Sequence, residues 1–315
     1  MSAAPLHSDL ELRQATGSPE PSSLEEAVHW TILYADIFDF PLTRDELFTF
    51  LVTVSGSRPA VDAAIDRALS NGYGLETDGK FVYLQGRAET VMRRLERSRL
   101  ARSAWRLGRF YAHLIWALPY VRMVAVTGTL AINNVEPGAD IDFLVVTEPG
   151  RLWMTRGMIV LLCRLARLRG DALCPNYLIS SRALQLDSHD LYAAHELAQM
   201  VPIHGKSVAQ RLWTENQWCR SFLPNARLDA LEGVDDRLSR PLAALKALAE
   251  WALHSPPGDM VERWERQRKI AKLSRQVPPE VSETLFTADV CKGHHQGHGG
   301  RIMQLFTARV ARTYQ

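Results

Sequence analysis

The sequence predicts an α+β protein in which helices flank a small mixed sheet. Three observations support this class. Helical patterns followed by two short strands occupy residues 24–84. A pair of apolar strands around a glycine turn lies within residues 123–147. The last third of the chain is rich in helix-forming residues and carries few strand signals.

The length and composition are those of a globular protein with two or three domains. The chain has 315 residues, of which 46% are hydrophobic and 23% are charged. This composition excludes collagen, a wholly disordered chain and a small disulfide scaffold. The formal net charge of +2 does not indicate any class of partner.

Cysteine usage and the N-terminal residues indicate the cytoplasm, with no membrane segment. The first 23 residues contain no apolar stretch of the kind found in a signal peptide. We expect residues 1–22 to form a disordered tail. The four cysteines are widely spaced and show no disulfide framework: Cys163, Cys174, Cys219 and Cys291.

Residues 23–88 show the element order of a winged helix. A first helix is expected over 24–39, and a capping box of Thr43 and Glu46 opens a second. A third helix is expected over 59–72, and a hairpin follows over 75–84 around an Asp-Gly turn. We therefore predict a winged-helix-like module.

DNA is not the favoured partner of this module. Its third helix carries Asp62 and Asp66 and a single cation, Arg67. Affinity for the phosphate backbone requires clustered lysine or arginine, whereas this helix would repel a duplex. Packing, or binding of a protein partner, is the favoured interpretation.

Residues 89–118 are expected to form a basic linker helix. Four of its arginines share one helical stripe, and a separate apolar stripe faces elsewhere. A solvated charged face is the favoured interpretation, and a phosphate or nucleic-acid track beside an active site is the alternative. The arginines are Arg93, Arg94, Arg97, Arg99, Arg102, Arg106 and Arg109.

Residues 119–186 are expected to form the domain that carries chemistry. A strand over 123–126 runs into a turn of small residues, and a second strand follows over 139–147. Strand alternation predicts that Asp140 and Asp142 share one face. Two neighbouring carboxylates need a counter-charge, which Mg²⁺ provides. The alternative is a pair of solvating or capping acids.

These residues resemble the active-site signature of the DNA polymerase β-like nucleotidyltransferase superfamily. The match covers Thr127-Gly128-Thr129-Leu130-Ala131 and the strand that begins Ala139-Asp140-Ile141-Asp142. The resemblance implies transfer of a nucleotidyl group from an NTP to an acceptor, with release of pyrophosphate. It also implies a catalytic core with a small mixed sheet.

The resemblance also implies roles for individual residues. Asp140 and Asp142 would be the catalytic residues and would hold Mg²⁺ or Mn²⁺. The nucleotide would bind at Thr127, Gly128 and Thr129, with Asn176 of the next expected strand nearby. The acceptor is a small molecule, a protein or RNA, and neither it nor the oligomeric state is indicated.

The chain departs from the family at the third carboxylate, which typically lies on the next strand. The expected strand over 173–180 contains no acid, and Asn176 is its nearest oxygen donor. A carboxylate arrives from elsewhere, for example from Glu196, or one metal suffices, or activity has been lost. The rival function is a non-catalytic nucleotide-binding regulator whose winged helix binds DNA or a partner. An RNA-directed transferase is a third possibility.

Residues 187–315 are expected to form a helical C-terminal region. Its helix near residue 195 would line a nucleotide cleft, with at least two of His195, Glu196 and Gln199 expected on the surface. A glycine-rich segment further on carries residue types that bind zinc, although a polar loop or a cleft-lining loop is favoured over zinc. These residues are Cys291, His294, His295 and His298.

Overall fold

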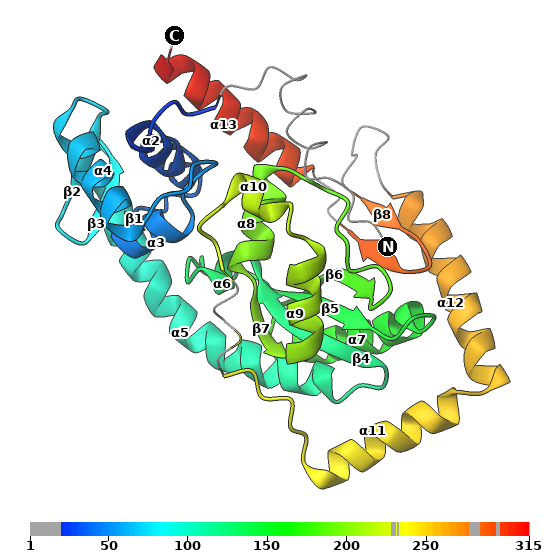
Figure 1. Cartoon of the computed structure of the whole chain (residues 1–315). Helices are drawn as coiled ribbons and strands as arrows, with labels where there is room; N and C mark the ends of the chain where they lie inside the picture. The colour runs from blue at the N-terminus through cyan, green and yellow to red at the C-terminus, as the bar shows by residue number, and fades with distance from the viewer. Residues whose placement is uncertain (1–19, 228–230, 232, 277–283, 294–296, 315) are drawn as a thin grey trace.

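The computed structural model describes residues 20–227, 231, 233–276, 284–293 and 297–314. It is a mixed α+β fold with a six-stranded sheet and a separate three-stranded sheet (Figure 1). Most of the expected N-terminal tail lies outside the described residues. No helix in the described part of the chain is long and apolar enough to cross a bilayer.

The N-terminal module has the expected order of helices and strands. It comprises α2 (Leu24–Ala35), α3 (Arg44–Thr49), α4 (Arg58–Ser70), β2 (Leu75–Thr77) and β3 (Phe81–Leu84), with an additional strand β1 (Leu42–Thr43). The predicted capping box is present. The Thr43 hydroxyl accepts the Glu46 N–H at 3.3 Å, and the Glu46 carboxylate accepts the Thr43 N–H at 2.8 Å.

The expected linker helix is α5 (Glu89–Trp116), which runs from the N-terminal module along the large sheet (Figure 1). Gly108 of this helix lies against Leu130 of α6 (Gly128–Ala131). A Cβ atom at Gly108 would lie 3.2 Å from Leu130 Cδ2, so the small residue allows this packing. The helix thereby supports the turn that follows β4.

The centre of the large sheet follows the prediction. β4 (Val121–Thr127) pairs antiparallel with β5 (Ile141–Thr147), and β5 pairs parallel with β6 (Leu173–Ser180). The crossover between β5 and β6 contains α7 (Leu152–Arg167), as a parallel pair requires. The sheet is therefore mixed, as expected.

The C-terminal region is mostly helical, and it also contributes strands that were not predicted from the sequence. It supplies three strands to the large sheet, whose order is β7-β4-β5-β6-β9-β8. These strands are β7 (Val201–His204), β8 (Leu285–Phe286) and β9 (Val290–Lys292). Pro202 lies in β7 at the edge of the sheet, where a residue without an N–H is tolerated.

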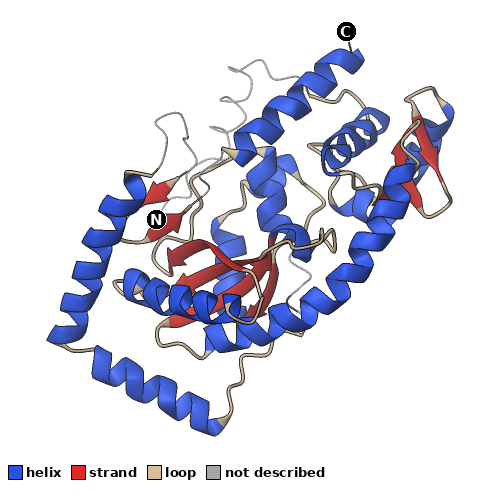
Figure 2. Cartoon of the chain, turned by 180° about the vertical axis from the view of Figure 1, so that it is seen from behind, coloured by secondary structure: helices blue, strands red, loops and turns tan. Residues whose placement is uncertain are grey.

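Helices cover both faces of the large sheet. Figure 1 shows α8 to α10 in front of it, and Figure 2 shows α5 and α7 on the opposite side. Along β5, Phe143 and Val145 pack with α5 and α7, while Leu144 and Val146 pack with the other layer. The remaining helices are α8 (Leu191–Gln199), α9 (Lys206–Glu215), α10 (Cys219–Phe222), α11 (Arg240–Leu253), α12 (Pro256–Ser274) and α13 (His298–Tyr314).

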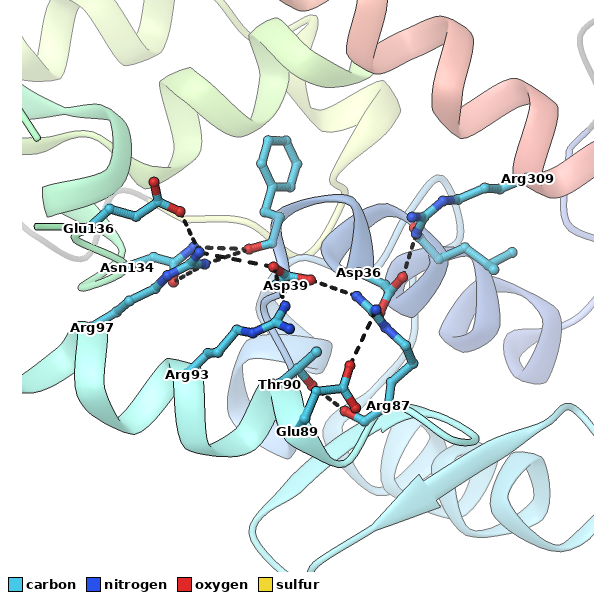
Figure 3. Close-up of polar contacts among 12 residues, drawn as sticks. Asp36, Asp39, Arg87, Glu89, Thr90, Arg93, Arg97, Asn134, Glu136 and Arg309 are labelled. Atoms are coloured by element: carbon cyan, nitrogen blue, oxygen red, sulfur yellow. Dashed lines mark hydrogen bonds and ion pairs between the residues drawn. The ribbon is translucent and has the colours of Figure 1, made fainter.

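A polar network fixes the N-terminal module against the rest of the molecule (Figure 3). It centres on the short helix η1 (Asp36–Phe38) and on Asp39. Asp36 accepts from Arg87 at 3.0 Å and from Arg309 of α13 at 2.6 Å. Arg97 donates to the Phe38 carbonyl at 3.1 Å and to Asn134 at 3.3 Å. The module therefore has a defined position beside the turn after β4.

Candidate functional site

A cavity of about 300 Å³ lies where the N-terminal helices, the turn after β4 and α8 meet. We call it the first cavity. Its polar side is formed by Gly128, Thr129, Asp142, Asn176 and Glu196. The structure thus brings together most of the residues that the sequence predicted for a nucleotide site. Thr127 is buried and lines an adjoining side pocket instead.

Gly128 and Asp142 lie so close together that a side chain at position 128 would collide with the carboxylate. Gly128 has a φ of +64°, and a Cβ atom there would lie 2.6 Å from Asp142 Oδ2. Thr127 and Asp142 are direct partners on β4 and β5. The sheet register therefore places the glycine turn against the carboxylate, and glycine satisfies both the left-handed backbone and the contact.

The carboxyl group of Asp142 is held in a poorly solvated position. Burial raises its pKa to about 6, and the charge of Asp140 adds to this shift, while a hydrogen bond from the Cys174 thiol opposes it. Cys174 is the partner of Asp142 on β6. Burial and the Asp142 charge raise the pKa of the Cys174 thiol to about 12, so it remains a protonated donor.

Glu196 provides a second carboxylate in the first cavity. Burial, and then the charge of Asp142, raise its pKa to about 7, whereas Lys292 lowers it. Lys292 of β9 shares the side pocket with Glu196 and donates to Ser188 Oγ at 2.9 Å. Glu196 was expected as one source of a third acid, whereas Lys292 was not predicted, because a three-residue strand carries no periodic signal.

Aromatic side chains form one wall of the first cavity. Tyr34, Phe38, Phe40 and Phe50 come from the N-terminal module. The His195 ring stacks on Tyr34 with centroids 4.2 Å apart and an angle of 18°. Burial lowers the pKa of His195 to about 4, so the imidazole is neutral near pH 7. This wall suits a flat ring such as a nucleobase.

The expectation of surface positions on α8 was wrong. His195, Glu196 and Gln199 all line the first cavity, because the N-terminal module packs over the face of α8 that carries them. The sequence of α8 alone does not contain this information, since the covering residues are far away in the chain.

Asp140 does not share the first cavity with Asp142. It is exposed and lines a second hollow on the α7 side of the sheet. Strand alternation does not apply to Asp140 because β5 begins at Ile141. The two acids are still close enough for the charge of Asp140 to act on Asp142.

The structure does not bring Cys291 and His298 together. Cys291 is buried in the layer that contains α7, while His298 begins α13 and lines the first cavity. His294 and His295 lie outside the described residues. Within the described ranges, no group of three or more histidine, cysteine, aspartate or glutamate residues is placed to hold a metal ion.

The arginines of α5 divide into two sets. Arg93, Arg94 and Arg97 form ion pairs with Asp39, Glu46 and Glu136, so they connect modules. The four with helical spacing are exposed: Arg99, Arg102, Arg106 and Arg109. The guanidinium of Arg109 lies 5.8 Å from the centre of the Trp105 ring.

The first cavity offers a suitable donor set for Mg²⁺ when a nucleotide is present. Mg²⁺ typically takes one or two carboxylates and completes its shell with water and substrate phosphates. Burial raises the pKa values of Asp142 and Glu196, because it disfavours their ionised forms. A cation between them and the phosphates would supply a compensating charge, and the amide oxygen of Asn176 is a further donor.

Comparison of the chain with protein-family models, with curated proteins and with solved structures finds no match. The function is therefore inferred from the geometry of the first cavity.

The raised pKa of Glu196 predicts a pH-dependent stability. Between pH 4.5 and about 7 the folded protein binds a proton that the unfolded chain has released. The free energy of unfolding of the metal-free protein should therefore fall as the pH rises through this window. At about 1.4 kcal/mol per pKa unit, the loss is at most about 3.5 kcal/mol.

Glu196→Gln reports this contribution, because His29, His195 and Asp142 titrate in an overlapping range and remain in both proteins. The measurement is the difference in urea-unfolding free energy between wild type and variant from pH 4.5 to 8. A difference in unfolding free energy that does not change with pH would contradict the raised pKa of Glu196.

Proposed function

We propose that this chain is a Mg²⁺-dependent nucleotidyltransferase that transfers NMP from an NTP to an acceptor and releases pyrophosphate. The observation that carries the proposal is the contact between the left-handed Gly128 and the carboxylate of Asp142. A glycine turn held against an aspartate at the ends of two neighbouring strands would direct backbone N–H groups and a metal ligand toward one phosphate group.

Several polar residues in and beside the first cavity have a role in this reaction. Gly128 and Thr129 hold the triphosphate, and Lys292 compensates its charge from the side pocket. Asp142, Glu196 and Asn176 would hold Mg²⁺ or Mn²⁺, with Asp140 on the acceptor side. The bound ion would neutralise charge that develops on the phosphate oxygens. An acceptor oxygen forms a bond to the α-phosphorus. The bond from the α-phosphorus to the oxygen that bridges it to the β-phosphate breaks, and pyrophosphate leaves.

The same proposal assigns roles to the two modules. Residues 119–186 form a polymerase β-like core, to which the later strands are added. Residues 23–88 form a winged-helix module that walls the first cavity and does not read DNA. The cations of α4 support this role, because Arg58 pairs with Asp62 and Arg67 pairs with Glu25. A cytoplasmic location fits an NTP-dependent activity and four free cysteines.

One observation favours the non-catalytic alternative. The β6 position nearest the site is occupied by Asn176, an amide instead of an acid. A regulator that binds a nucleotide without turnover would need no third carboxylate on this strand. The two functions differ in one measurable outcome, the release of pyrophosphate.

The test is incubation with each α-labelled NTP and Mg²⁺ or Mn²⁺ in the presence of a cell-extract metabolite pool. Wild type should release pyrophosphate and label one class of acceptor, and Glu196→Gln should reduce the rate by about 10²-fold or more. If the chain bound nucleotide but released pyrophosphate under none of these conditions, the result would contradict the enzyme and favour the non-catalytic regulator.

A further inference from the structure

The second hollow, which Asp140 lines, has a volume of about 360 Å³ and lies on the α7 side of the sheet. Three arginines of α7 line it: Arg156, Arg164 and Arg167. Their spacing places them on one face of the helix. Arg164 and Arg167 are exposed, and neither forms an ion pair within the described part of the chain.

The guanidinium groups of this hollow have unused hydrogen-bonding capacity. The Nε atom of Arg156 is buried and has no hydrogen-bond partner among the described residues. A buried donor without a partner is costly, so such an atom indicates a missing acceptor. Of the acids that line the hollow, Asp171 already accepts the Tyr111 hydroxyl at 2.7 Å.

Much of the remaining lining of the hollow is apolar. Val160 and Cys163 lie on the same helix face as the arginines, and Leu273 and Phe286 come from α12 and β8. A hollow with a cluster of arginines beside an apolar surface fits a molecule that has both an anionic group and an apolar part. Arginine binds phosphate through two parallel hydrogen bonds, and the apolar side chains favour an organic body.

The hollow also lies next to the first cavity. Asn176 lines both spaces, and Cys174 lines the hollow while its thiol donates to Asp142. A ligand in the hollow therefore lies on the other side of the β5–β6 edge from the nucleotide, next to Asp140.

From this geometry we infer that the second hollow is a binding site for an organic phosphate, with the phosphate on Arg156, Arg164 and Arg167. In the reaction proposed above, this ligand is the acceptor; that assignment rests on the proposed function, whereas the binding itself does not.

Phenyl phosphate and inorganic phosphate are the probes, titrated calorimetrically into the full chain without NTP or metal. Phenyl phosphate should bind about tenfold more tightly than inorganic phosphate because of the apolar surface. The double variant Arg164→Ala, Arg167→Ala should weaken phenyl phosphate about tenfold or more, since each charge-assisted hydrogen bond contributes strongly.

Arg169→Ala is the matched control, because Arg169 is exposed just beyond α7 and does not line the hollow. The Arg169→Ala variant should bind phenyl phosphate with the same affinity as wild type. If the control and the double variant lost the same affinity for phenyl phosphate, nonspecific attraction between charges would explain the binding and the proposed site would be overturned. Equal affinities of wild type for the two probes would also overturn it. Single Arg164→Lys and Arg167→Lys variants provide the same comparison if the double variant is unstable.

Asp142→Asn separates this inference from the proposed function. It should abolish the response to Mg²⁺ and NTP yet leave phenyl phosphate binding unchanged. A loss of phenyl phosphate binding in Asp142→Asn, with binding retained in the arginine double variant, would place the ligand in the first cavity and overturn the inference.

Discussion

Asp142→Asn is expected to abolish the stabilisation that Mg²⁺ and an NTP together give to the folded protein. A ligand that binds only the folded state contributes about 2.7 kcal/mol at about a hundredfold excess over its Kd. Asp142 is the carboxylate next to Gly128, so an amide there removes the charge that holds the ion against the phosphates. Thermal unfolding with and without Mg²⁺ and NTP measures the loss.

Without metal, the same variant is expected to be more stable than wild type at pH 8. Burial raises the pKa of Asp142 to about 6, so the ionised group is disfavoured in the folded state above that pH. Its removal returns up to about 3 kcal/mol, at about 1.4 kcal/mol per pKa unit. The asparagine oxygen still accepts a hydrogen bond from Cys174.

Asp66→Asn provides the control, because Asp66 is an exposed acid of α4 and its replacement makes the same change in charge. This variant should keep the wild-type response to Mg²⁺ and NTP. Equal thermal shifts in wild type and Asp142→Asn would show that the nucleotide binds elsewhere. The absence of a shift in both would remove the support for nucleotide binding and for the enzyme.

The parts of the fold that the sequence predicted are those specified by neighbouring residues. The capping box at Thr43 needs only Glu46 and the intervening backbone. The strands β4 and β5, the turn at Gly128 and the helix α7 follow from apolar runs and turn residues within a short segment. The contact between Gly128 and Asp142 follows from this local order.

The parts that were missed depend on residues that are distant in the chain. β7 and β9 have four and three residues, and each is a strand because it pairs with β4 or β6. Lys292 reaches the site only through that pairing. Likewise, Glu196 faces a cavity because aromatic side chains of the N-terminal module cover α8. Local propensity does not contain such pairings.

Gly128→Ala is expected to have the largest effect of any single methyl group added to the site. Alanine at a φ of +64° is strained by about 1–2 kcal/mol. Its Cβ would also lie 2.6 Å from Asp142 Oδ2, so the carboxylate must move. The variant should therefore lose stability together with Mg²⁺-dependent NTP binding and pyrophosphate release.

Gly138→Ala separates strain from the displacement of Asp142. Gly138 has a φ of +78°, and a Cβ atom there would meet no atom within 4 Å. It should thus lose about 1–2 kcal/mol in urea unfolding while its nucleotide response stays at the wild-type level. Retained NTP binding and turnover in Gly128→Ala would mean that the approach of Gly128 to Asp142 is not part of the active site. Loss in Gly128→Ala alone would tie nucleotide binding to the position of that carboxylate, because the two variants share the same backbone strain.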